Sequence, residues 1–182
     1  MHITPTPLAG LFVIEPAVHR DARGFFVETW RDAWLQEIGA PAPFIQDNHA
    51  YSSAAGVVRG LHFQAPPATQ SKLIWASRGS IFDVAVDLRK SSPTYGQHFA
   101  LELSSQNFLR LFVPRGFAHG YMTTAPDTEV QYKVDSFYSP QHEGGLLWND
   151  PALGVAWPDA GEIIVSAKDE RLPLLADWDS PF

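Results

Sequence analysis

The 182-residue sequence predicts an all-β protein, a sandwich or barrel of the jelly-roll kind with one or two short helices. Short segments in which apolar residues occupy alternate positions recur along the chain, and this period of two is typical of strands. In the segment 80–88, for example, Phe82, Val84 and Val86 share one face. Fifteen prolines and thirteen glycines are spread through the chain, so they mark turns between many short elements and not a linker.

Ten segments between these turn signals are predicted to be strands: 11–15, 24–28, 44–52, 57–64, 72–77, 80–88, 96–103, 109–113, 118–123 and 128–134. Only 29–38 is predicted to be helical, with Thr29 as its N-cap and with Gly39 and Pro41 as stop signals. A barrel of such strands can hold a small ligand among inward-facing polar side chains at one end.

Length, charge and cysteine usage narrow the class of protein. The chain suits a single domain, residues 1–182, that buries roughly 70% of its unfolded surface. Thirteen Lys and Arg against twenty Asp and Glu leave a net charge of −7, which argues against a nucleic-acid polymer or an anionic membrane as partner. Without an apolar membrane span or signal peptide, the expected location is cytoplasmic. Zero cysteines exclude thiolate zinc sites and thiol nucleophiles.

Three predicted strands carry a reactive side chain on a face that is otherwise suited to burial: His62 in 57–64, Lys72 in 72–77 and Tyr132 in 128–134. A single inward His or Tyr is most often a core residue satisfied by one hydrogen bond. An inward Lys is much rarer, because desolvating an ammonium without a partner is costly. Together the three groups would supply a base, an acid and a cation for a developing oxyanion.

A second group of candidates is basic: Arg23, Arg59, His119 and Lys168. Taken singly, such residues are usually solvated surface charges, but an anionic ligand of this acidic chain needs a local basic cluster. Arg59 lies three residues before His62 and would point to the opposite side of a regular strand. A β-bulge at Gly60 would restore a common direction.

The segment from Pro114 to His119 has the Pro-x-Gly-x-x-His spacing of the second cupin motif, in which a turn presents a His to the barrel interior. Metal-binding cupins carry His-x-His and a following Glu in the first motif. Here those positions contain His62 and Gln64, followed by Ala68 and Thr69. Two imidazoles alone make a poor divalent site, so we expect no metal and no other cofactor.

Eight runs of residues together resemble the dTDP-4-dehydrorhamnose 3,5-epimerase family over nearly the whole chain. They are 21–28 (DARGFFVE), 46–48 (QDN), 59–64 (RGLHFQ), 82–89 (FDVAVDLR), 114–120 (PRGFAHG), 132–135 (YKVD), 148–151 (WNDP) and 166–169 (SAKD). The resemblance implies a homodimeric, metal-independent cupin barrel. It also implies inversion of C3 and C5 of dTDP-4-keto-6-deoxy-glucose on the route to dTDP-L-rhamnose.

The resemblance assigns His62 as the base, Lys72 as the partner of the enolate oxygen and Tyr132 as the acid on the opposite face of the sugar. Asp169 would orient His62, although the residues alone leave Asp83 as an alternative.

The remaining family positions imply contacts with the nucleotide and the sugar. Arg23, Arg59, His119 and Lys168 would hold the pyrophosphate. Glu28, Gln46, Asp47, Asn48 and Glu143 match positions expected to hydrogen-bond the sugar or the base, and Phe26 and Tyr138 would stack on thymine.

Three other functions use part of the same set of residues: a single-position epimerase, a nucleotide-sugar binder and a metal-dependent dioxygenase. An epimerase that inverts C3 only or C5 only would use the same base and acid, and two departures border the pocket: Gly-Tyr-Met-Thr-Thr after His119, and Ser71 before Lys72. A non-catalytic nucleotide-sugar binder has no use for an opposed acid and base. A metal-dependent dioxygenase would need the missing ligands.

Overall fold

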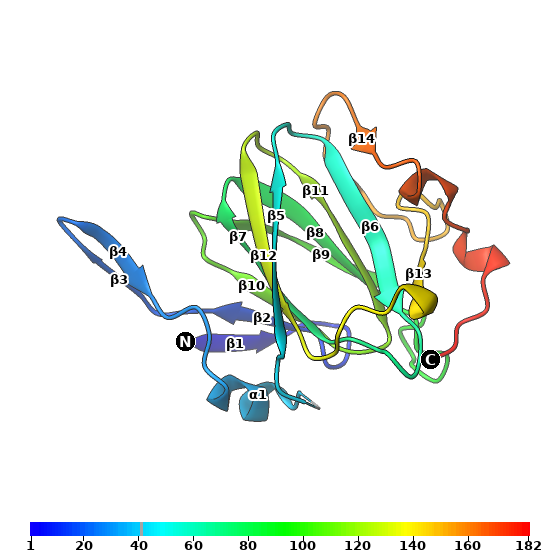
Figure 1. Ribbon diagram of the computed structural model, residues 1–182, viewed down its shortest axis with the longest axis horizontal. Helices are drawn as coiled ribbons and strands as arrows, with labels where there is room; N and C mark the ends of the chain where they lie inside the picture. The colour runs from blue at the N-terminus through cyan, green and yellow to red at the C-terminus, as the bar shows by residue number, and fades with distance from the viewer. Residues whose placement is uncertain (41) are drawn as a thin grey trace.

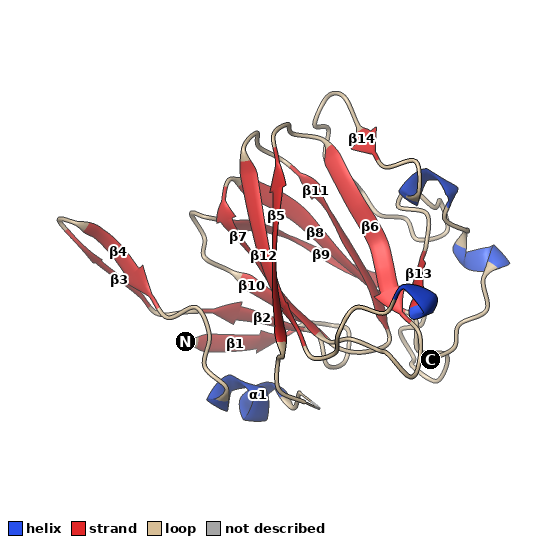
Figure 2. Cartoon of the chain, in the orientation of Figure 1, coloured by secondary structure: helices blue, strands red, loops and turns tan. Residues whose placement is uncertain are grey.

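Two antiparallel sheets face each other across the computed structural model, which describes residues 1–40 and 42–182 (Figures 1 and 2). The first sheet has the order β1 (His2–Pro5), β2 (Phe12–Glu15), β10 (Arg110–Val113), β7 (Lys72–Arg78), β12 (Thr128–Val134) and β5 (Gln46–Ser52). The second has the order β13 (Glu143–Gly145), β6 (Val57–Gln64), β11 (Phe117–Thr123), β8 (Ser80–Asp87) and β9 (His98–Ser104), with β14 (Ile164–Val165) parallel to β6. The predicted all-β, cupin-type jelly-roll barrel is confirmed.

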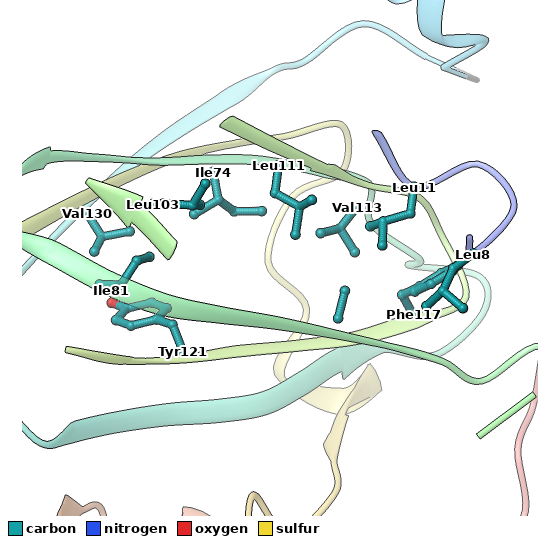
Figure 3. Packing of buried hydrophobic residues seen from close by; sticks show 11 residues of the cluster. Leu8, Leu11, Ile74, Ile81, Leu103, Leu111, Val113, Phe117, Tyr121 and Val130 are labelled. Atoms are coloured by element: carbon teal, nitrogen blue, oxygen red, sulfur yellow. The ribbon is translucent and has the colours of Figure 1, made fainter. Parts of the chain in front are cut away.

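Apolar side chains from both sheets fill the barrel interior, among them Ile74 and Val130 from one sheet and Ile81 from the other (Figure 3). Ala85 on β8 belongs to the same cluster. Strand β8 therefore turns its odd-numbered residues inward. Its more uniformly apolar face, with Val84 and Val86, packs instead against the C-terminal segment on the outside of the sheet. Because both faces of β8 are buried, apolar alternation alone does not identify the barrel interior.

The outer face of the first sheet is covered by α1 (Ala33–Ile38) and neighbouring aromatic residues. The helix is shorter than the predicted 29–38, and its N-cap is Asp32 and not Thr29. Trp30 lies before the helix and packs in the covering layer, and its indole donates a 2.9 Å hydrogen bond to Asp32. Gly39 ends the helix with φ 63° as predicted, and Pro41 lies outside the described residues.

All ten predicted strands are present, with ends that differ by at most two residues. The structure adds four short strands: β1, β13, β14 and β3 (Val18–Asp21). Strand β3 pairs with β4 (Gly24–Val27) in a hairpin that projects away from the barrel (Figure 1). Short 3₁₀ turns η1 (Pro140–His142), η2 (Asp169–Arg171) and η3 (Leu175–Asp177) complete the described elements. No helix in the described ranges is long and apolar enough to cross a bilayer.

Candidate active site

A cavity of about 500 Å³ is lined by side chains from β5, β6, β7, β11 and β12. Its walls come from both sheets and from the C-terminal segment after residue 163. The predicted site residues that line it are Arg59, His62, Lys72, His119, Tyr132, Lys168 and Asp169. Segments far apart in sequence therefore bring the predicted base, acid, ammonium and part of the basic cluster to one space.

His62 lies on β6 and is held by Asp169. The imidazole Nε2 is 2.7 Å from Asp169 Oδ1, and the other carboxylate oxygen accepts a 3.2 Å hydrogen bond from the backbone N–H of Gly60. Burial raises the pKa of Asp169, but the hydrogen bonds from His62 and Gly60 outweigh it and hold this pKa below its ordinary value. An ionised Asp169 that accepts the Nε2 proton leaves Nδ1 as the basic nitrogen.

The predicted bulge at Gly60 is present. His119 on β11 pairs with His62, but Tyr121, two residues further, pairs with Arg59, so β6 carries one extra residue between these pairs. Gly60 has φ 116°, and a Cβ there would lie 2.7 Å from the Cα of Gly120. A residue without a side chain is needed here, and the extra residue lets Arg59 and His62 line the same cavity.

Lys72 begins β7 on the facing sheet, and its Nζ donates a 3.4 Å hydrogen bond to the backbone carbonyl of His62. Burial lowers the pKa of Lys72 to about 8, while the carboxylates of Asp83 and Glu143 act in the opposite direction. A buried ammonium with so few direct partners gains most from a new negative charge in the cavity.

Tyr132 lies on β12, in the same sheet as Lys72 and across the cavity from the sheet of His62. Its neighbours in register are Asn48 on β5 and Ile74 on β7. Burial raises the pKa of Tyr132, and Arg59 offsets part of this rise. The phenol therefore keeps its proton at neutral pH and can act as an acid.

His119 and Asp83 form a second pair, on neighbouring strands of the sheet that carries His62. The Nε2 of His119 is 3.0 Å from both carboxylate oxygens of Asp83. The alternative of Asp83 as the orienter of His62 is therefore wrong: its carboxylate contacts His119, and that of Asp169 contacts His62.

Lys168, Glu143 and Tyr138 form a connected group at the rim of the cavity. Glu143 Oε2 contacts Lys168 Nζ at 2.6 Å and accepts a 2.7 Å hydrogen bond from Tyr138. These contacts overcome the effect of burial and lower the pKa of Glu143. Only Lys168 of the three lines the cavity itself.

Gln46 and Asn48 share the face of β5 that carries Ala50, which lines the cavity, and they hydrogen-bond each other at 2.8 Å. Asp47 lies between them and points to the opposite face, where it forms a 2.6 Å ion pair with Lys133. The structure brings Gln46 and Asn48 towards the cavity and leaves Asp47 outside it.

Arg23, Phe26 and Glu28 do not reach this cavity within one chain. They belong to the projecting hairpin and the residue after it (Figure 1). The side chain of Arg23 is 90% exposed and pairs with Asp21, and Phe26 is 70% exposed. Glu28 pairs with Arg31.

Tyr121 lines the cavity but was not among the predicted site residues. The available signal was its position two residues after His119, which places both side chains on one face of β11. Among the described residues, no group of three or more His, Asp or Glu side chains is placed to hold a metal ion.

A barrel whose facing walls present an imidazole held by a carboxylate, a protonated phenol and a buried ammonium defines an enzyme of proton transfer. The chain belongs to the dTDP-4-dehydrorhamnose 3,5-epimerase family, whose model matches residues 5–177, and is therefore an isomerase.

Individual proteins of known name that resemble the chain have the same family name or a related one. The dTDP-4-dehydrorhamnose 3,5-epimerase of Sinorhizobium fredii is 44% identical over 97% of this chain and 91% of its own length. The crystal structure of the enzyme of that name from Bacillus anthracis, with TDP and PPi bound, is 46% identical, with a TM-score of 0.91, and covers 96% of this chain and 99% of its own. A 3'-monoepimerase from Streptomyces bikiniensis, in complex with dTDP-quinovose, is 33% identical, with a TM-score of 0.89 over 97% of this chain and 88% of its own.

Proposed function

We propose that the protein inverts C3 and C5 of dTDP-4-dehydro-6-deoxy-D-glucose and forms dTDP-4-dehydro-L-rhamnose, a step of dTDP-L-rhamnose biosynthesis. The observation that carries this proposal is that His62 and Tyr132 lie on facing walls of one cavity, with Lys72 beside them. The higher identity to 3,5-epimerases than to the 3'-monoepimerase favours two inversions over one.

The reaction begins with proton removal next to the C4 ketone. C3 and C5 are both adjacent to this carbonyl, so loss of either proton leaves an enolate whose negative charge rests on the C4 oxygen. His62 Nδ1 takes the proton, and ionised Asp169 stabilises the imidazolium that forms. The C4 carbonyl of the substrate itself accepts the electron pair, so this step needs no other electron acceptor.

Lys72 stabilises the enolate oxygen. Its ammonium is already buried and fixed, so little reorganisation is needed as charge develops. Tyr132 then gives its phenolic proton to the carbanion carbon from the opposite face, which inverts the configuration. His62 then releases the proton it gained to solvent and Tyr132 takes one up, so both groups are restored before the second carbon reacts.

Arg59, His119 and Lys168 contribute positive charge or hydrogen-bond donors to the nucleotide end of the ligand. Arg59 is exposed at the cavity, with its Nη2 3.2 Å from the carbonyl of Tyr51, and its guanidinium suits a pyrophosphate. Gln46, Asn48, Glu143 and Tyr138 are proposed to bind the sugar or the base. The outward position of Asp47 supports no direct contact by that residue within one chain.

A homodimer is part of the proposal. Phe25 and Phe26 are 57% and 70% exposed on a hairpin that extends from its own barrel, which is the form of an element that docks on a second copy. In such a dimer Arg23, Phe26 and Glu28 would contact the ligand in the partner's site.

We propose one domain, residues 1–182, acting in the cytoplasm, since a doubly charged nucleotide sugar does not cross a bilayer unaided.

The test is incubation of the protein with dTDP-4-dehydro-6-deoxy-D-glucose in heavy water, followed by NMR. We expect deuterium at both C3 and C5 and the L-rhamno product. Deuterium and inversion at one carbon alone would establish a single-position epimerase, and absence of both would refute the proposed activity.

A further inference from the structure

Tyr121 is a buried phenol in the cavity wall to which the proposed reaction gives no role. It lies on β11 between its register partners Arg59 on β6 and Asp83 on β8. The residue is 5% exposed and lines the cavity, so the cavity is its route to solvent. Figure 3 shows its ring packed at one end of the interior cluster, near Ile81 and Val130.

The hydroxyl of Tyr121 has no hydrogen-bond partner in the described part of the chain. Two tyrosines do have protein partners: Tyr51 donates to Asp127 at 2.6 Å, and Tyr138 donates to Glu143 at 2.7 Å. Those two hydroxyls are also exposed, where water could have served them. Among the described residues, the hydroxyl of Tyr132, which lines the same cavity, has no protein partner either. Most of the Tyr121 side chain is buried, but its hydroxyl is not among the fully buried atoms that lack a partner, so it is accessible from the cavity, where a ligand oxygen can accept its hydrogen bond.

The depth of Tyr121 indicates which part of a ligand it meets. His119, two residues before Tyr121, pairs directly with His62, so the phenol lies one step along the wall from the proposed base. Arg59, the register partner of Tyr121, is exposed at the mouth of the cavity, whereas Tyr121 is buried. Arg59 at the mouth would meet the pyrophosphate, and Tyr121, which is buried deeper in the same wall, would meet the hexose held at His62.

The ionisation state agrees with a donor role. Burial raises the pKa of Tyr121, with smaller opposing and reinforcing effects from Arg59, Tyr132 and Asp83. The hydroxyl therefore stays protonated throughout the neutral range and can donate to a sugar oxygen.

We propose that the hydroxyl of Tyr121 hydrogen-bonds a hydroxyl group of the hexose and makes no contact with the nucleotide. This inference rests on the proposed function and adds a substrate-binding residue to it. The bond would hold the sugar ring against the wall of His62, with its other face towards Tyr132.

The test compares Tyr121→Phe with Tyr95→Phe, which makes the same chemical change on a surface turn where Tyr95 is 37% exposed. Calorimetry would measure binding of dTDP and of dTDP-glucose, which does not react because it has no ketone. We expect Tyr121→Phe to weaken dTDP-glucose about fivefold, the effect of one uncharged hydrogen bond, and to leave dTDP unchanged. KM for the keto sugar should rise by the same factor, with kcat unchanged. Tyr95→Phe should match wild type.

Two results would overturn the inference: unchanged binding of both ligands, or equal weakening of both. Thermal unfolding of both variants shows whether Tyr121→Phe remains folded, and its isosteric ring makes this the expected result. Because calorimetry needs no turnover, the outcome is separable from the proposed function. If the wild-type protein proved inactive but Tyr121→Phe still bound dTDP-glucose more weakly, the proposed reaction would be refuted and the proposed contact of Tyr121 would be supported.

Discussion

The two His–Asp pairs of the barrel share their chemistry and differ in access and anchoring. His62 and His119 are register partners on β6 and β11, and each turns its Nε2 to a buried carboxylate. The side chain of His62 is 30% exposed, but that of His119 is 8% exposed. Asp169 contacts His62 from the 3₁₀ turn η2, whereas Asp83 lies on β8, the strand next to the one that carries His119.

The difference indicates which histidine suits each of the two proposed roles, the base and a ligand-binding residue. The imidazole of His62 retains contact with the cavity and can exchange a proton with a ligand, while Asp169 stabilises its charged form. Both oxygens of Asp83 contact the same nitrogen of His119, which fixes that ring as part of the wall. Both imidazoles line the cavity and both have a carboxylate partner, so the exposed fraction of the ring is what distinguishes the proposed base from the proposed binding residue.

The largest effect is expected from replacing the two histidines in parallel. His62→Asn should lower kcat by about 10³-fold and abolish deuterium exchange at C3 and C5, because it removes the proposed base. His119→Asn should mainly raise KM. The assay is NMR of the substrate in heavy water. Retained exchange in His62→Asn, or its loss in His119→Asn alone, would reverse the two roles.

Replacing the two carboxylates should give a smaller contrast. Asp169→Asn should lower kcat by about 10²-fold, since an amide does not stabilise the imidazolium, with KM nearly constant. Asp83→Asn should change kcat less and lower the melting temperature more, because Asp83 is fully buried. Steady-state kinetics and thermal unfolding provide the measurements. A larger kcat loss in Asp83→Asn would contradict the assignment of Asp169.

The pKa of Lys72 predicts how kcat depends on pH, and it depends in turn on the carboxylate of Asp83. Its ammonium form is required to stabilise the enolate, so kcat should fall as pH rises through about 8. Replacement by Arg should move this alkaline limb upwards, because a guanidinium keeps its proton. Asp83→Asn should move it downwards, because the carboxylate favours the charged lysine. A pH profile of kcat tests all three, and an unchanged limb in Lys72→Arg would exclude Lys72 as its source.

The same pKa affects stability with a definite sign. The folded-state pKa of Lys72, about 8, lies below its ordinary value of 10.5, so the unfolded chain binds more protons between these two values. The contribution of Lys72 to the free energy of unfolding therefore rises with pH across this window.

The smallest effect is expected at Arg110, a buried charge without the partner that Asp83 and Asp169 have. It is 2% exposed, its Nε and one terminal nitrogen have no hydrogen-bond partner in the described ranges, and burial lowers its pKa to about 10. Trp34 and Trp75 face the guanidinium. Arg110→Met keeps the packing and removes the desolvated charge, so it should leave the free energy of unfolding unchanged or raise it by about 1 kcal/mol. Denaturant unfolding measures this, and a loss above about 2 kcal/mol would show that the ring contacts dominate.

Sequence patterns anticipated the strands and the inward direction of His62, Lys72 and Tyr132, because side chains alternate between the two faces of a strand within each regular stretch. They also anticipated the bulge at Gly60, since Arg59 and His62 could not otherwise share a face. The partner of His62 could not be derived in this way. Asp169 lies in a 3₁₀ turn 107 residues away, and the choice against Asp83 depends on how the C-terminal segment crosses β6.

Other parts of the site were beyond local patterns for physical reasons. Asp47 belongs to a polar run in which Gln46 and Asn48 turn inward, and the cavity position of Ala50 and the pairing of Asp47 with Lys133 show which parity faces the cavity. Arg23 lies on a hairpin supported by its own two strands, so its distance from the cavity follows from tertiary structure alone. Tyr121 resembled a core aromatic, and its missing hydrogen-bond partner is visible only in three dimensions.

The most direct test of the opposed base and acid is a comparison of proton exchange with inversion in Tyr132→Phe. The variant retains His62, Asp169 and Lys72, so the enolate should still form. We predict that deuterium still enters C3 or C5 from the His62 face with retained configuration, while the yield of inverted product falls much further than exchange does. Equal loss of exchange and inversion would contradict the placement of acid and base on opposite faces of the sugar.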